Sequence, residues 1–177
     1  GRSIGEYDDK IPSNLTAEQI LIRSGNIGSV RIGQKIGGEG MKNFLQNIGV
    51  LNKIEFDIEE IGEPIPFRWG KCKLATASFG HGITTTLIQL VKGYSIISNG
   101  GFDIKPKLVK RKFEENKKKR ILSQAVSQEI NPILRKIVST KEGTANFANI
   151  EGYDVGGKTG TAQKSINGVY SVSYTHL

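Results

Sequence analysis

The chain alternates between stretches in which apolar residues recur at helical spacing and short interruptions rich in glycine. Its strongest helical pattern begins at Leu87 and is stopped by Asn99-Gly100-Gly101. The apolar positions of that pattern lie three and four residues apart, which predicts that they form the buried stripe of one helix. These positions are Leu87, Leu90, Val91, Tyr94 and Ile97.

Three shorter helices are predicted before residue 50. Thr16 and Gln19 have the spacing of a capping box, which opens a helix over the letters AEQILIR. Ser24-Gly25-Asn26 interrupts that helix. A second helical pattern then runs to Gly37-Gly38, and a third (MKNFLQNI) ends at Gly49, a residue type that often follows a helix.

One more helix is predicted over residues 127–139, with Ser127 or Asn131 as its cap. Pro132 is expected in the first turn, because proline is tolerated there and disrupts the interior of a helix. Four apolar residues of this segment are predicted to be its buried stripe. They are Ile133, Leu134, Ile137 and Val138.

Strand patterns occupy the later part of the chain. Residues 107–113 and 120–124 are predicted strands on either side of a charged tip, EENKKK. Residues 152–163 lead through several glycines into a further strand, and residues 168–174 are its predicted partner. Helices grouped in the middle and strands late in the chain indicate the α+β class.

Charge and cysteine content narrow the function classes. The 177 residues carry a net charge of +8, but residues 105–120 hold nine Lys and Arg against two Glu, so the remainder is nearly neutral. A solvated hairpin tip is the simplest interpretation of this basic segment, and binding to an anionic surface is the alternative. Nucleic acid is not expected as a partner, because Phe113 is the one aromatic residue in the segment. Cys72, the single cysteine, excludes an internal disulfide and a multi-cysteine zinc site, and is expected to be a buried thiol on a strand.

Lys158-Thr159-Gly160 is a candidate binding motif that continues into Thr161. On an edge strand, Lys158 and Gly160 would point to one face, and Thr159 and Thr161 to the other. Gly160 would allow the backbone of a substrate to approach closely. Taken alone, the motif is better explained as an exposed strand with a solvated lysine.

Ser24-Gly25-Asn26 is a second candidate motif, placed at the junction of two predicted helices. In a tight loop, Ser24 and Asn26 can offer a hydroxyl and an amide in one direction. The alternative is a plain helix C-terminus, with Asn26 as the cap of the next helix.

Together the two motifs resemble the penicillin-binding proteins and class A β-lactamases, which carry Ser-x-x-Lys, Ser-x-Asn and Lys-Thr-Gly in that order. Lys158 follows Asn26 by 132 positions. Residues 20–37, 79–101 and 142–164 are also similar to the class B penicillin-binding proteins. Residues 10–170 as a whole resemble the transpeptidase domain of a class B enzyme of the division type.

The resemblance implies a role for each site residue. Ser24 would shuttle a proton between the nucleophile and the departing amine, and Asn26 would position the substrate. Lys158 would hold Ser24 and supply positive potential for the terminal carboxylate of the substrate. Thr159 and Thr161 would bind that carboxylate, and the Thr161 N–H would form half of an oxyanion hole.

The same resemblance implies a fold and an activity. The fold is a five-stranded antiparallel sheet flanked by helices, with an all-helical lobe. About residues 10–150 would form the helical lobe and basic hairpin, residues 150–171 the Lys-Thr-Gly strand and the start of the next strand, and residues 172–177 do not resemble the family. The enzyme would cross-link peptidoglycan stem peptides ending in D-Ala-D-Ala, through a serine acyl-enzyme that β-lactams also form. The resemblance implies no cofactor or metal. It places the enzyme at the periplasmic face of the bacterial cytoplasmic membrane. It also implies divisome membrane proteins as partners.

One motif of the family is missing from this sequence. No serine among the 177 residues is followed by lysine three positions later. The nucleophile is therefore expected upstream, on a larger protein in which this chain begins at an arbitrary point, and the chain by itself is expected to be inactive. Two alternatives stay open: a serine β-lactamase or β-lactam sensor, and a non-catalytic module that binds polyanions through residues 105–120.

Overall fold

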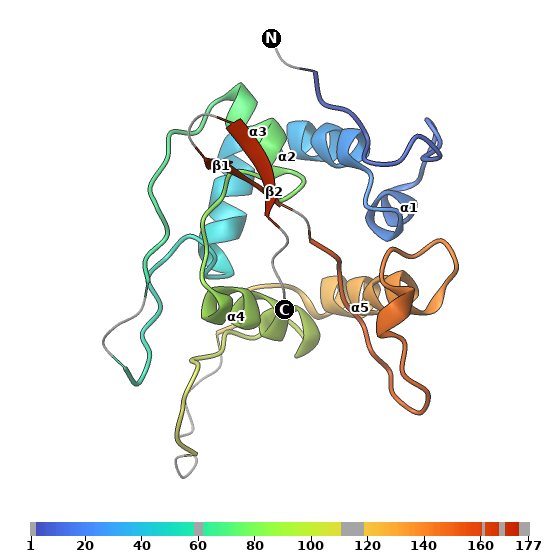
Figure 1. The fold of residues 1–177 in the computed structure, drawn as a ribbon. Helices are drawn as coiled ribbons and strands as arrows, with labels where there is room; N and C mark the ends of the chain where they lie inside the picture. The colour runs from blue at the N-terminus through green and yellow to red at the C-terminus, as the bar shows by residue number, and fades with distance from the viewer. Residues whose placement is uncertain (1–2, 59–61, 111–118, 161, 167–168, 174–177) are drawn as a thin grey trace. The chain divides into compact units, whose positions relative to one another are not determined.

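The computed structural model describes residues 3–58, 62–110, 119–160, 162–166 and 169–173 (Figure 1). Six helices and two strands follow one another in this part of the chain. They are α1 (Ala17–Ile22), α2 (Asn26–Asn47), α3 (Lys71–Ala77), α4 (Leu87–Ser98), α5 (Gln124–Ser139), the 3-10 helix η1 (Asn146–Ala148), β1 (Ala162–Ile166) and β2 (Val169–Ser173). No helix in these residues is long and apolar enough to cross a membrane.

Two compact units share these elements. Unit 1 comprises residues 1–38, 69–82 and 132–177, and unit 2 comprises residues 39–68 and 83–131. Both helices that pass from one unit to the other do so at residues that disfavour a helix. In α2 the boundary follows Gly37, whose backbone is not helical (φ 80°, ψ 161°). This break confirms the two separate helical patterns predicted there, and in α5 the boundary falls at Pro132.

The core of unit 1 lies between α1 and the second half of α5. Ile22, Ile137, Val138 and Ala145 are buried together, and partly buried Ile133 and Leu134 pack against them. The predicted stripe of the last helix is therefore confirmed. Helix α1 begins at the predicted capping box, in which Gln19 N donates to Thr16 Oγ1 (3.2 Å) and Thr16 N donates to Gln19 Oε1 (2.9 Å).

The start of α5 corrects the sequence prediction. The helix begins at Gln124 rather than at 127, and Val126 N donates to the hydroxyl of Ser123, which lies just before the helix. Ser127 is instead buried inside the helix, where its hydroxyl donates to the Ile97 carbonyl. Pro132 consequently lies well inside the helix, at a cost of about 3 kcal/mol or more. We attribute the continuity of α5 to contacts on both sides of the proline. Before it, Ser127 bonds to the Ile97 carbonyl, and after it, Ile137 and Val138 are buried in the core.

Helix α4 has the predicted bounds but buries a different face. Gln89, Gly93 and Ile96 are buried, while 65% of Leu87 and 58% of Val91 are exposed, so the predicted buried stripe is wrong. The Gln89 side chain can be buried because its polar atoms are satisfied. Its Nε2 donates to the Asn52 carbonyl (2.5 Å), and its Oε1 accepts from the backbone N–H at the start of the helix (2.7 Å).

The strands and Cys72 also differ from expectation. Residues 107–110 and 121–124 form no strand, and one isolated bridge pairs Phe102 with Arg120; residues 111–118 lie outside the described part. Cys72 is exposed and lies on α3, a helix that the sequence pattern did not reveal. Late in the chain, β1 and β2 pair antiparallel, with Ser165 opposite Tyr170, but β1 begins only at Ala162, after the Lys-Thr-Gly segment that was expected on the strand.

Candidate active site

The Ser24 turn ends helix α1. Gly25 N donates to Ile20 O (2.9 Å), and Ser24 N donates to Leu21 O (3.3 Å). This is the Schellman pattern, in which the residue after the C-cap adopts a left-handed conformation that favours glycine. Ser24 occupies that position with φ 57°, although it carries a Cβ atom. The predicted helix C-terminus is confirmed, and the serine is held there against its local preference.

Glycine occupies the same position at the ends of α2 and α4. Gly49 (φ 85°) follows α2, where Val50 N donates to Leu45 O. Gly100 (φ 88°) follows α4 with the equivalent bond to Ile96 O. In α2 and α4 the left-handed residue of this motif is glycine, whereas at the candidate site it is a serine.

Asn26 does not cap the helix that follows. Its Nδ2 donates to the Gly5 carbonyl (3.0 Å), so its side chain is turned away from the N–H groups of α2. The N–H groups of Asn26 and Ile27 are bound instead by the carboxylate of Glu6, which the sequence did not single out. The alternative reading of Asn26 as a helix cap is therefore wrong. Among the described hydrogen bonds none goes to Asn26 Oδ1, which can therefore serve as an acceptor for another group.

The Lys158 side chain reaches Ser24. Its Nζ donates to Ser24 Oγ over 2.6 Å, across 134 positions of sequence. It also donates to the Thr159 carbonyl (3.0 Å) and the Thr159 hydroxyl (3.3 Å). Burial lowers the pKa of Lys158 from its usual 10.5 to about 8, because desolvation disfavours the ammonium form. The lysine is thus neither solvated nor remote, and it can both donate to a hydroxyl and titrate close to physiological pH.

Residues 155–157 bring Lys158 into position by bonding to helix α5. Gly157 N donates to the Leu134 carbonyl (3.1 Å), and Arg135 donates to the Val155 carbonyl (3.0 Å). A Cβ atom on Gly156 would come within 3.3 Å of the α5 backbone, so glycine suits this close approach. Lys158, Thr159 and Gly160 do not lie on a paired strand, since β1 begins at Ala162. The expected alternation of their side chains across an edge strand is therefore corrected.

The Thr159 hydroxyl has a second partner that sequence reasoning missed. Thr144 Oγ1 lies 2.7 Å from Thr159 Oγ1, and either hydroxyl can donate. Thr144 is in the loop after α5, and no motif marks it. Gly160 is exposed, and a Cβ atom there would meet no atom within 4 Å, so space for a close-lying backbone exists on that side. Thr161 lies outside the described residues.

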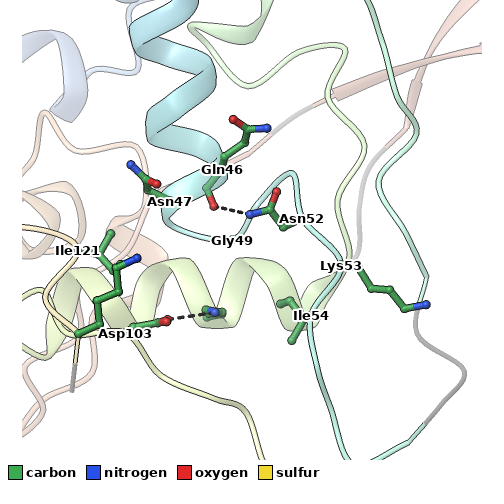
Figure 2. Close-up of a pocket in the computed structure, with 10 residues that line it drawn as sticks. Gln46, Asn47, Gly49, Asn52, Lys53, Ile54, Asp103 and Ile121 are labelled. Carbon is green, nitrogen blue, oxygen red and sulfur yellow. Dashed lines mark hydrogen bonds and ion pairs between the residues drawn. The ribbon is translucent and has the colours of Figure 1, made fainter. Parts of the chain in front are cut away.

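Two other features of the described residues bear on the chemistry. No group of three His, Cys, Asp or Glu side chains in this part of the chain could hold a metal ion. Unit 2 contains a polar pocket in which lining residues bond to one another (Figure 2). There Lys92 pairs with Asp103 (3.0 Å), and the Asn52 amide donates to the Gln46 carbonyl (2.8 Å). The hydrogen-bonded pair of Ser24 and Lys158 lies in unit 1.

Comparison with known families fits this geometry. Residues 1–175 match the model of the penicillin-binding protein transpeptidase domain. The chain belongs to that family. The family predicted from the motifs is confirmed, and within it Ser24-Gly25-Asn26 and Lys158-Thr159-Gly160 are two sequence motifs that the fold brings into contact.

Relatives agree with the assignment to the penicillin-binding transpeptidases. Stage V sporulation protein D of Bacillus subtilis is 34% identical over 166 residues, which cover 86% of this chain and 25% of that protein. Probable peptidoglycan D,D-transpeptidase FtsI of Caulobacter vibrioides is 30% identical over 169 residues, covering 92% of this chain and 28% of that protein. The chain thus spans about a quarter of the length of these relatives.

Solved structures of penicillin-binding proteins share the fold. The apo transpeptidase domain of Burkholderia pseudomallei penicillin-binding protein 3 matches with a TM-score of 0.79 at 27% identity. The match covers 89% of this chain and 48% of that domain. Penicillin-binding protein 3 of Mycobacterium tuberculosis, solved with aztreonam, matches with a TM-score of 0.77 at 26% identity, covering 88% of this chain and 39% of the other. The predicted transpeptidase fold is therefore confirmed at the level of the family.

Proposed function

We propose that this chain supplies the Ser-x-Asn and Lys-Thr-Gly parts of a serine D,D-transpeptidase that cross-links peptidoglycan stem peptides. The observation that carries the proposal is the 2.6 Å bond from Lys158 Nζ to Ser24 Oγ. An ammonium that donates to a hydroxyl leaves the hydroxyl proton free to be passed to another group. Acyl transfer needs such a proton path beside its nucleophile.

The proposed reaction begins on a nucleophilic serine of the Ser-x-x-Lys motif, which these 177 residues do not contain. We propose that this serine lies elsewhere in a longer protein. Its Oγ attacks the carbonyl carbon of the penultimate D-Ala, a C–O bond forms, and the C–N bond to the terminal D-Ala breaks. The Ser24 hydroxyl relays the proton lost by the attacking serine to the departing amine, so that Ser24 ends the step with a proton of its own. The amine of a neighbouring stem peptide then attacks the acyl carbon: a C–N bond forms, the C–O bond to the serine breaks, and the proton lost by the amine returns to the serine.

Lys158, Thr159 and Asn26 would bind the substrate in this scheme. With a pKa of about 8, Lys158 is mainly charged at neutral pH and attracts the terminal carboxylate of the stem peptide. The Thr159 hydroxyl lies beside Lys158 Nζ (3.3 Å) and would donate to the same carboxylate, together with Thr161. The Asn26 amide would hold the peptide carbonyl. β-Lactams carry a carboxylate and an activated amide at a similar spacing, so they would acylate the same serine.

The wider setting belongs to the same proposal. The β1–β2 hairpin would form two strands of a five-stranded sheet. The enzyme would act on the periplasmic face of the bacterial cytoplasmic membrane, with divisome membrane proteins as partners. The name of one relative indicates sporulation and that of another D,D-transpeptidation. The role we propose is cell-wall or septum synthesis, as the resemblance to enzymes of the division type implies.

Fluorescent penicillin tests the proposal directly. The full-length protein that contains these residues is expected to take up the label covalently and to keep it for many minutes. Lys158→Ala should slow acylation at least about 100-fold, because the Ser24 hydroxyl and the β-lactam carboxylate both lose a charged partner. Lys35→Ala, an exposed lysine on α2, is the matched control and should label normally. No label on the wild type would refute the transpeptidase, and an adduct that clears within seconds would indicate a β-lactamase.

A further inference from the structure

Helix α2 has no capping side chain at the position directly before it. That position is Gly25, which has no side chain to accept a hydrogen bond from the first N–H groups of the helix. The first N–H groups of a helix have no partner inside the helix and need one from elsewhere. In most helices a Ser, Thr, Asp or Asn at the cap position supplies that acceptor. At this junction the acceptor has to come from a distant part of the chain.

Glu6 supplies the acceptor from 20 positions upstream. Its Oε2 accepts from Asn26 N over 2.6 Å, and its Oε1 accepts from Ile27 N over 3.0 Å. A carboxylate at a helix N-terminus is also favoured by the helix dipole. One side chain therefore binds two successive N–H groups, the first of which belongs to the Ser24-Gly25-Asn26 motif.

The neighbours of Glu6 bind the same turn on both of its sides. The Gly5 carbonyl accepts from the Asn26 side chain (3.0 Å), and the Tyr7 hydroxyl donates to the Arg23 carbonyl (3.1 Å). Residues 5–7 thus contact the residue before Ser24 and the residues after it. Ser24 itself is held with φ 57°, a conformation that persists in a non-glycine residue only where its surroundings fix it.

We propose that Glu6 is a positioning residue for the active site. Through the N–H groups of Asn26 and Ile27, it fixes the turn in which the Ser24 hydroxyl faces Lys158. Without its carboxylate the first turn of α2 loses two bonds, Ser24 can relax from its left-handed conformation, and the 2.6 Å contact with Lys158 lengthens. This role rests on the proposed transpeptidase function, because it is exerted on the proton path of that reaction.

The test measures acylation of the full-length protein by fluorescent penicillin, well below its unfolding temperature. Glu6→Ala is expected to lower the second-order rate constant roughly 10- to 100-fold, the range for losing a charge-assisted hydrogen bond. Glu6→Gln keeps one acceptor oxygen and should lie between Glu6→Ala and wild type. Asp8→Ala is the matched control, because it removes the same charge from the same segment and its carboxylate contacts only Lys10 N among the described hydrogen bonds.

A double-mutant cycle separates positioning from mere stabilisation. If Glu6 acts through the Ser24 hydroxyl, Glu6→Ala should slow acylation by less than about threefold in a Ser24→Ala background. A purely structural role would give the same fold loss in both backgrounds. Amide hydrogen exchange gives a second readout. The exchange rates of the Asn26 and Ile27 N–H groups should increase in Glu6→Ala and stay the same as in wild type in Asp8→Ala.

Each result decides the matter. A rate within twofold of wild type for Glu6→Ala overturns the positioning role, as does an equal loss in Asp8→Ala or full additivity with Ser24→Ala. Faster exchange of the two amides without a change in acylation also overturns it, since the clamp would then serve the fold alone. A wild-type protein that takes no label, with both amides protected, refutes the proposed function rather than the contacts of Glu6.

Discussion

Ser24 is the one non-glycine residue with a positive φ in the described part of the chain, and this makes a prediction about stability as well as activity. Two substitutions separate the hydroxyl from the backbone. Ser24→Ala removes the hydroxyl and keeps a Cβ atom in the left-handed region. Ser24→Gly removes both. Because the lost contact with Lys158 is common to the two variants, the difference between them reports the backbone alone.

The expected difference follows from the φ angle. A Cβ atom in the left-handed region costs roughly 1–2 kcal/mol. Glycine avoids this cost but loses roughly 0.5–1 kcal/mol through the greater freedom of the unfolded chain. The glycine variant should therefore have a free energy of unfolding about 0.5–1 kcal/mol above that of the alanine variant, or a Tm higher by about 2 °C. Both variants should be acylated equally slowly by fluorescent penicillin, because neither has the hydroxyl.

A control pair of variants at Arg31 should show the opposite order of stability. Arg31 is exposed within the helical part of α2, where glycine is about 1 kcal/mol less favourable than alanine. Arg31→Gly should therefore be less stable than Arg31→Ala in the same chemical-denaturation experiment. An alanine variant at Ser24 that is as stable as the glycine variant, with the Arg31 pair behaving as expected, would refute the strained turn.

Three further predictions concern the lysine, its threonine neighbours and the packing beneath the turn. The pKa of Lys158 is lowered to about 8 in the folded chain, so between about pH 8 and 10.5 the unfolded chain binds more protons at this site than the folded chain does. The free energy of unfolding should therefore increase as pH rises through that range. Lys158→Met should remove this increase when denaturation is measured at several pH values. The same titration should weaken recognition of a β-lactam carboxylate above pH 8, and Lys158→Arg should move that alkaline limit upward. Thr144→Val keeps the shape of the side chain but removes the hydroxyl 2.7 Å from its partner threonine, and should lower β-lactam affinity by about threefold to tenfold, whereas Thr144→Ser should not. A Cβ atom on Gly28 would lie 2.6 Å from the Ile20 side chain, so Gly28→Ala should lower the free energy of unfolding by about 1–3 kcal/mol. Adding Ile20→Ala should partly restore the stability of that variant. Gly38→Ala is the control, because no atom lies within 4 Å of a Cβ atom there, and it should show no such loss.

The sequence by itself determined the features that depend on neighbours a few residues apart. The capping box at Thr16, the end of α2 at Gly49 and the bounds of α4 follow from local hydrogen bonds and helical periodicity. The two motifs could also be read from the chain, since the order of Ser24 and Lys158 carries the family pattern. The helix caps and bounds need only the residues that surround them in sequence, and the motifs need only their order along the chain.

Tertiary structure decided which of the possible contacts are made. Helix α4 buries Gln89 rather than Val91, because the carbonyl of a residue distant in sequence accepts a hydrogen bond from the Gln89 amide. The spacing of apolar residues along the chain cannot predict such a partner. The Ser24 hydroxyl meets Lys158 only because segments 134 positions apart are held together by α1 and α5, and Glu6 caps a helix that starts 20 positions later. A polar group pairs with whatever the fold places within about 3 Å, and that distance is set by the packing of the whole unit.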